Sequence, residues 1–156
     1  MSYSDRGQRG AAPATGTMSL DDVKKIIAVD NAKLLVEQAE AIGKQAAEAR
    51  LTTNQIRNVY GPVRQIELTW PVLDERSSEQ DRQLASKAYR EVILLKPKLG
   101  YLAARDPKLA TLERLFSAAI DEIGNSTEDR ERRIRFKRFV EFFEAILAYH
   151  KKYGGK

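Results

Sequence analysis

Cationic side chains at helical spacing are the residues of this sequence best suited to chemistry, and the chemistry they suit is the binding of phosphate groups. Arg57 and Arg64 are seven residues apart, which places them on one flank of a helix, with Gly61 between them. Two guanidinium groups can hold successive phosphates while the glycine lets a nucleic-acid backbone come close. The alternative is that both arginines pair with Glu67 or point into solvent.

A second cationic cluster surrounds Pro97. One predicted helix carries Lys96, Lys98 and Arg105. Tyr101 lies between the last two, so that Lys98, Tyr101 and Arg105 occupy positions i, i+3 and i+7. An aromatic ring between two cations suits a nucleic-acid backbone that has a base or ribose stacked on the ring. The alternative is that Tyr101 packs in the core while Lys98 reaches past it to solvent.

A third cluster lies near the start of the last predicted helix and contains Arg130, Arg132, Arg133, Arg135, Lys137 and Arg138. Positive charge there opposes the helix dipole and costs roughly a few tenths of a kcal/mol per residue unless an anion compensates. We therefore expect part of this cluster, including Arg135 and Arg138, to bind RNA or an acidic neighbouring subunit. Because the arginines surround the whole helix, only some of them can face one ligand.

The end of the same helix carries Lys151 and Lys152 next to His150. The two lysines are candidates for phosphate binding, although cations at a helix C-terminus are also stabilised by the helix dipole without any ligand. His150 falls on an apolar stripe, so we expect it to be packed and hydrogen-bonded.

The inventory of reactive side chains argues against catalysis. The chain has one histidine and no cysteine, which excludes a histidine pair for acid–base chemistry, a multi-histidine metal site within one subunit, and thiolate or disulfide chemistry. Glu141 and Glu144 share a helix face and could hold a metal, but a solvated surface is the commoner outcome. No glycine-rich phosphate loop or nucleophile motif occurs. We predict a protein that is not an enzyme and needs no cofactor.

Composition fits a small soluble protein with a polyanionic partner. The 156 residues are 42% hydrophobic, and 27 Lys and Arg exceed 22 Asp and Glu to give a net charge of +5. No long uncharged apolar segment and no signal-peptide pattern is present, so we expect a cytoplasmic protein without a membrane contact.

These side chains must be positioned by helices, because apolar residues recur at helical spacing and no strand pattern competes. We predict an all-α fold, a compact bundle of about five helices in a single domain spanning residues 18–156, after a flexible N-terminal tail at 1–17. The first helix begins after the N-cap Ser19, and its apolar period continues as far as Ala46.

Prolines interrupt the next two predicted helices. Thr52 opens the second helix, in which Pro62 predicts a kink, with a full break as the alternative. Ser77 or Ser78 caps the third helix, whose apolar period continues through Pro97. A kinked helix and two abutting helices both fit that pattern.

Two further helices complete the predicted bundle. Asp106 and Pro107 begin the fourth helix and Gly124 ends it, while Ser126 or Thr127 caps the fifth. The fifth helix carries two neighbouring apolar stripes, so it lies at the centre of the bundle or covers a subunit interface. One stripe consists of Phe136, Val140, Phe143, Leu147 and His150, and the other of Phe139, Phe142, Ile146, Tyr149 and Tyr153.

Three segments together resemble one known family. LTTNQIRNVY, LLKPKLGYLAARD and FVEFFEAILAYHKKYGG are similar to segments of the small helical subunit of the type III-A CRISPR effector, the Csm complex. The resemblance covers most of residues 20–155, and the combination of QIR, KPKLxYxAxR and EAxxAYHK is fairly specific. Gly61 and Pro62 depart from the uninterrupted helix of the family, and so does the extended N-terminal tail.

The resemblance implies a noncatalytic subunit, present in several copies, that serves antiviral defence. Such copies stack along the duplex of guide RNA and target RNA beside the other effector subunits, and they contact phosphates without reading sequence. A homodimer of the free protein is a further expectation. Carried over by motif, the contact residues are Arg57, Lys96, Lys98, Arg105 and Lys151. The alternative function is a helical scaffold or dimerising adaptor that acts mainly through protein–protein contacts.

Overall fold

The described part of the chain, residues 18–156 of a computed structural model, contains helices and no strand. It has six α-helices and one 3-10 turn: α1 (Leu20–Ala28), α2 (Ala32–Glu48), α3 (Thr53–Thr69), α4 (Glu79–Arg105), η2 (Pro107–Leu109), α5 (Ala110–Gly124) and α6 (Asp129–Lys152). The predicted all-α class is confirmed. The predicted tail at 1–17 lies outside the described residues.

The expected first helix is two helices, which corrects the predicted number from five to six. The chain leaves the helical conformation at Val29, which is extended with φ −135° and ψ 156°. Asn31 then caps α2 by accepting a hydrogen bond from the Leu34 N–H at 3.1 Å. Asparagine favours this cap position over a helix interior because its short side chain bonds to nearby backbone groups.

The two proline-containing helices are continuous. Pro62 lies inside α3 and Pro97 lies inside α4, so neither the break nor the pair of abutting helices occurs. The carbonyls that lose a partner belong to Asn58 and Ile93, which are exposed residues, so water can replace the missing backbone donor. The kinks expected at the two prolines remain predictions.

Most of the predicted helix starts are confirmed by their caps. Ser19 accepts from the Asp22 N–H, Thr52 forms a capping box with Gln55, and Ser78 accepts from the Asp81 N–H. The expected cap of the last helix is wrong. The helix α6 begins after Glu128 without a side-chain cap, because Ser126 accepts instead from the Glu128 N–H, ahead of the helix.

Asp106 and Pro107 have the predicted arrangement of cap and first residue, but the element they open is the 3-10 turn η2. The Asp106 side chain accepts from the Lys108 N–H at 3.1 Å. The helix α5 then follows directly and ends at Gly124, as predicted.

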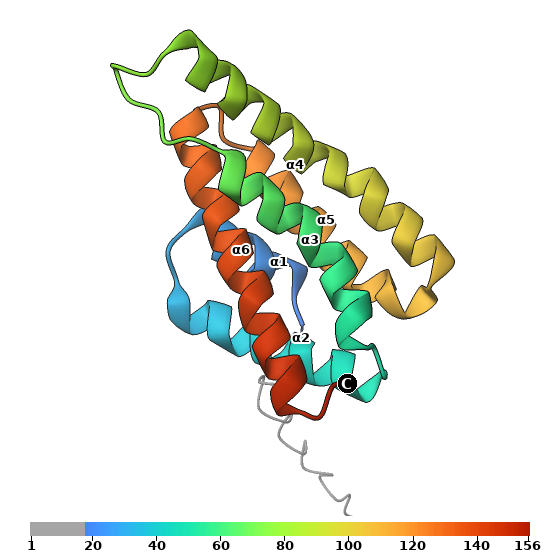
Figure 1. The fold of residues 1–156 in the computed structure, drawn as a ribbon. Coiled ribbons are helices and arrows are strands. Elements are labelled where there is room, and N and C mark those ends of the chain that lie inside the picture. Colours follow the sequence, from blue (N-terminus) through green and yellow to red (C-terminus); the bar gives the residue numbers. More distant parts are fainter. Residues whose placement is uncertain (1–17) are drawn as a thin grey trace, which may run out of the picture.

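The last helix is the centre of the bundle. In Figure 1, α3 lies between α6 and α4, with α1 and α5 behind them and α2 crossing one end. The four phenylalanines of α6 are at most 2% exposed within the chain, so this part of its two stripes forms the core. They are Phe136, Phe139, Phe142 and Phe143. No helix in residues 18–156 is long and apolar enough to cross a membrane.

Candidate functional site

The loop between α2 and α3, residues 49–52, brings three distant segments together. The His150 ring near the end of α6 donates from Nε2 to the Leu51 carbonyl at 2.6 Å, because a carbonyl can only accept. On the other side of the loop, the Gln55 amide donates to the Asp106 carboxylate. The start of α3, the end of α4 and the end of α6 therefore meet at one end of the bundle, which we call the basic end.

A second contact fixes the register of α3 against α6. The Tyr60 hydroxyl donates to the Glu144 carboxylate at 2.7 Å, and the Tyr60 ring lies 5.2 Å from the Phe143 ring. Burial, followed by the hydrogen bond to Glu144, raises the pKa of Tyr60 to about 12. Arg57 lies one turn from this contact toward the basic end, and Lys151 lies two turns from it in the same direction.

Four of the predicted contact residues present exposed cations at the basic end. Arg57, Lys98, Arg105 and Lys151 are all exposed. Among residues 18–156, the side chains of Arg57, Lys98 and Lys151 form no hydrogen bond or ion pair. These three cations are therefore available to an external anion.

Tyr101 joins this surface. Its side chain is 61% exposed, so the alternative in which it packs in the core is wrong. The Arg105 guanidinium lies 5.8 Å from the Tyr101 ring centroid, and its Nη1 is 3.5 Å from the Tyr101 hydroxyl. The pair forms an exposed aromatic surface with a positive charge beside it.

Three other predicted contact residues are paired within the chain. Arg64 forms an ion pair with Glu67, which is the alternative that the i, i+3 spacing allowed. Lys96 pairs with Asp121 of α5. The exposed Lys152 Nζ lies 3.5 Å from the Glu40 carboxylate.

Glu40 links α2 to the end of α6. The Tyr153 hydroxyl donates to its carboxylate at 2.7 Å. This hydrogen bond, opposed by burial and helped by the nearby charge of Lys152, lowers the pKa of Glu40.

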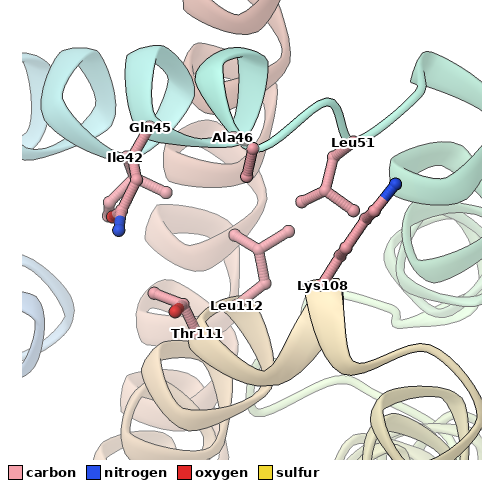
Figure 2. A pocket seen from close by; sticks show the side chains of 8 residues that line it. Ile42, Gln45, Ala46, Leu51, Lys108, Thr111 and Leu112 are labelled. Atoms are coloured by element: carbon pink, nitrogen blue, oxygen red, sulfur yellow. The ribbon is translucent and has the colours of Figure 1, made fainter.

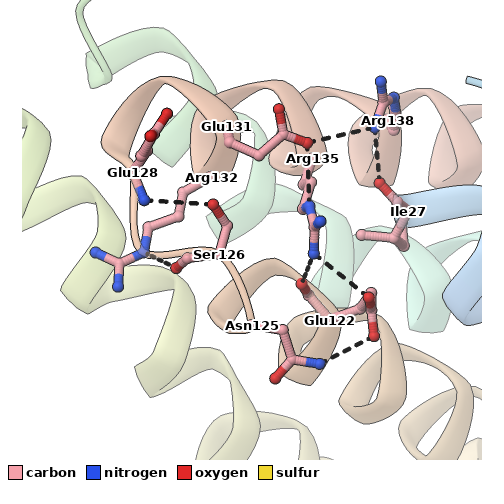
Figure 3. A network of polar contacts seen from close by, with 9 residues as sticks. All are labelled: Ile27, Glu122, Asn125, Ser126, Glu128, Glu131, Arg132, Arg135 and Arg138. Carbon is pink, nitrogen blue, oxygen red and sulfur yellow. Dashed lines mark hydrogen bonds and ion pairs between the residues drawn. The ribbon is translucent and has the colours of Figure 1, made fainter. Parts of the chain in front are cut away.

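Arg135 and Arg138 face inward, away from the basic end. Figure 3 shows Arg135 donating to the Glu122 carbonyl at 2.7 Å and bonding to the carboxylates of Glu122 and Glu131. Arg138 donates to the Ile27 carbonyl at 3.0 Å. These carbonyls lie in the last turns of α5 and α1, where a cation satisfies free acceptors and complements the helix dipole.

Two more arginines of the same cluster contact carbonyls of other segments. Arg132 donates to the Ser126 carbonyl at 2.7 Å and lies 4.0 Å from the centroid of the Tyr89 ring. Arg133 donates to the carbonyl of Trp70, the C-cap residue of α3, at 3.1 Å. In the sequence, the arginines occur on all sides of this helix. That distribution indicates that they contact several different neighbouring segments, as each side of α6 does.

A scan against protein-family models adds an independent observation. The model described as Csm2 Type III-A matches residues 29–156, which is most of the chain. The chain belongs to this family. Csm2 proteins are structural small subunits of the type III-A Csm complex and associate with its other subunits. Neither the search of curated proteins nor the search of solved structures found a match.

The two carboxylates predicted as possible metal ligands both belong to α6. Glu141 and Glu144 are exposed on α6, and Glu144 accepts the Tyr60 hydrogen bond. Within residues 18–156, no group of three His, Asp or Glu side chains is placed to hold a metal ion.

The inward arginines of this Csm2 chain give a testable stability effect. Changing Arg135, whose side chain is 17% exposed, to glutamine should lower the free energy of unfolding by about 1.5–3 kcal/mol, because hydrogen bonds to charged groups are lost. The matched control is Arg130→Gln, since Arg130 is exposed and its side chain has no hydrogen bond or ion pair among residues 18–156. Urea denaturation of both variants makes the comparison, and equal stabilities contradict the structural role of Arg135.

Proposed function

We propose that the basic end binds the RNA backbone without reading its sequence, as part of a noncatalytic, cytoplasmic small subunit of the type III-A effector. The observation that carries the proposal is the convergence of Arg57, Lys98, Arg105 and Lys151, from three helices, as exposed cations at one end of the bundle. Membership of the Csm2 family supports an RNA-containing assembly as the setting.

The chemistry of the basic end suits phosphate more than base edges. Arg57, Lys98 and Lys151 are exposed, and no hydrogen bond within residues 18–156 orients their donors toward one pattern of acceptors. Long side chains held only at their base follow a phosphate backbone of any sequence, whereas base reading needs donors in fixed positions. Tyr101, with Arg105 beside it, offers a ring for a base or ribose. Guide and target RNA then supply specificity by pairing with each other.

Contacts with other protein subunits involve a different part of α4. Ile93 and Leu94 are 38% and 43% exposed, and together with Tyr89 they line one hollow on the surface of α4. Exposed apolar side chains along one helix favour a protein partner. This observation supports docking to neighbouring effector subunits, further copies of the chain included, in addition to RNA binding. Dimerisation of the free protein remains a prediction.

Charge reversal tests the RNA proposal directly. In the reconstituted effector, the triple variant Arg57→Glu, Lys98→Glu and Arg105→Glu should bind target RNA at least about tenfold more weakly at low salt. The dependence of log affinity on log salt should also become shallower by about 0.7 for each single-strand phosphate that the variant no longer neutralises. Titration of labelled target RNA at several salt concentrations measures both quantities.

The matched control reverses three exposed cations of other surfaces, Lys24, Lys33 and Arg130, none of which has an ion pair within residues 18–156. It changes the net charge by the same amount and should leave affinity much closer to that of the wild type. Size-exclusion chromatography checks that both variants enter the complex. If the two triple variants bind target RNA equally well at every salt concentration, the basic end is not the RNA-binding surface.

A further inference from the structure

Arg50 has a backbone conformation that its residue type disfavours. Its φ is 62°, and it is the one residue other than glycine with a positive φ in residues 18–156. It follows Ala49, the C-cap of α2, and two hydrogen bonds fix it there, from the Arg50 N–H to the Ala47 carbonyl and from the Leu51 N–H to the Ala46 carbonyl, both 3.0 Å. This pair of bonds defines a Schellman motif, in which glycine is the favoured residue at the position of Arg50.

The same motif at the end of α6 does contain glycine. Gly154 has a φ of 88°, and its N–H donates to the Lys151 carbonyl at 3.1 Å. The Gly155 N–H donates to the His150 carbonyl at 2.8 Å. The two helices therefore end in the same geometry, with glycine in one and arginine in the other, so the geometry itself does not explain the arginine.

Contacts within the chain do not explain it either. Arg50 is exposed, and its side chain has no hydrogen bond or ion pair within residues 18–156. The loop around it is nevertheless fixed, because Leu51 is 3% exposed and bonds to His150, while Thr52 forms the capping box of α3. The loop thus holds the base of the Arg50 side chain at a set position on the basic end. A disfavoured backbone conformation at a residue whose side chain makes no stabilising contact within residues 18–156 points to a functional role.

A second cation lies across a small pocket from this loop. Ala49 and Leu51, the chain neighbours of Arg50, line the pocket together with Lys108. Figure 2 shows the Lys108 side chain extending toward Leu51 and the start of α3, with its amine at the edge of the pocket. Lys108 is exposed and its ammonium group has no ion pair within residues 18–156.

We propose that Arg50 and Lys108 form a second phosphate-binding site for the RNA strand, on the α2–α3 loop. The site rests on the proposed function and deepens it, because it continues the RNA path from the face of α3 and α4 around the basic end to α2. Its ligand is a phosphodiester group, held by one guanidinium and one ammonium group that the chain leaves unpaired.

Two substitutions at Arg50 separate strain from binding. Arg50→Gly removes the charge and the strain together, so the melting temperature should rise by about 2–4 °C, while the affinity of the reconstituted effector for labelled target RNA falls about two- to fivefold. Arg50→Lys keeps both the charge and the strain, so its melting temperature and its affinity should stay close to those of the wild type. Lys108→Gln should lower RNA affinity like Arg50→Gly, without the rise in melting temperature.

The outcomes distinguish this site from the basic end as a whole. Guide RNA retained by each purified complex is measured beside target binding, so the result also tells which strand supplies the phosphate. Suppose that Arg50→Gly leaves guide-RNA retention and target-RNA affinity at wild-type levels, while the triple variant at Arg57, Lys98 and Arg105 loses target RNA. The loop site is then refuted and the proposed function stands. If the triple variant loses nothing, the proposed function itself fails. An unchanged melting temperature for Arg50→Gly removes the strain argument and overturns the inference.

Discussion

Replacing Phe143 with alanine should lower the free energy of unfolding by about 3–5 kcal/mol, because the substitution opens a large cavity in the centre of the bundle. Phe143 is 0% exposed. Its ring stacks on Phe116 of α5 at 4.5 Å and lies 5.2 Å from Tyr60 of α3. Three helices therefore share this one ring. Urea denaturation followed by circular dichroism measures the loss.

Tyr101→Ala is the control for removing an aromatic ring. Tyr101 is 61% exposed, so its removal should change the free energy of unfolding by no more than about 0.5 kcal/mol. The same variant should weaken RNA binding if Tyr101 belongs to the RNA surface. A cost below about 1 kcal/mol for Phe143→Ala is too small for a ring that joins three helices, and it contradicts the packing described above.

Gly43→Ala should destabilise the protein by about 2–3 kcal/mol, although alanine is the better helix former. A Cβ at Gly43 of α2 lies 2.7 Å from the Tyr149 Cβ and 2.8 Å from both the His150 nitrogen and the Ile146 carbonyl oxygen of α6. Two of these three atoms belong to the backbone, so no side chain can rotate away to make room. The two helices must separate, which also strains the His150 bond to Leu51.

The control for Gly43 is another glycine inside a helix, Gly100 of α4. A Cβ at Gly100 meets nothing within 4 Å, and no proline follows it. Gly100→Ala should stabilise the protein by about 0.5–1 kcal/mol, since alanine loses less backbone entropy on folding. Thermal melts of the two variants test the opposite signs. The close contact of α2 with α6 is refuted if Gly43→Ala is as stable as Gly100→Ala.

The sequence predicts the helices well where the apolar spacing and the capping residues agree. It predicts them less well where a helix ends but the apolar spacing continues into the next helix. Thr52 and Ser78 carry side chains that favour a helix start, and both occupy those positions. The break after Ala28 is hidden because Ala32 and Leu35 continue the apolar spacing on its far side. The cap at Asn31 is visible in the sequence but weak, since asparagine also occurs on helix surfaces.

The candidate site divides in the same way between local and distant interactions. The pairing of Arg64 with Glu67 could be foreseen from their spacing, since i, i+3 residues meet on a helix. The partners of Lys96 and Arg138 are 25 and 111 residues away, and no local pattern indicates them. Arg50 was not predicted at all, because its importance lies in a backbone angle that the residue type argues against.

The packing of α2 on α6 has a consequence for how the protein is made. The small-residue face of α2 around Gly43 packs on α6, which begins at Asp129, far along the chain from the end of α2 at Glu48. The N-terminal part of the chain leaves the ribosome first during synthesis. This face of α2 therefore stays exposed until α6 has emerged. Folding of this subunit is thus completed late in synthesis. Until then, the nascent chain offers an apolar surface to chaperones.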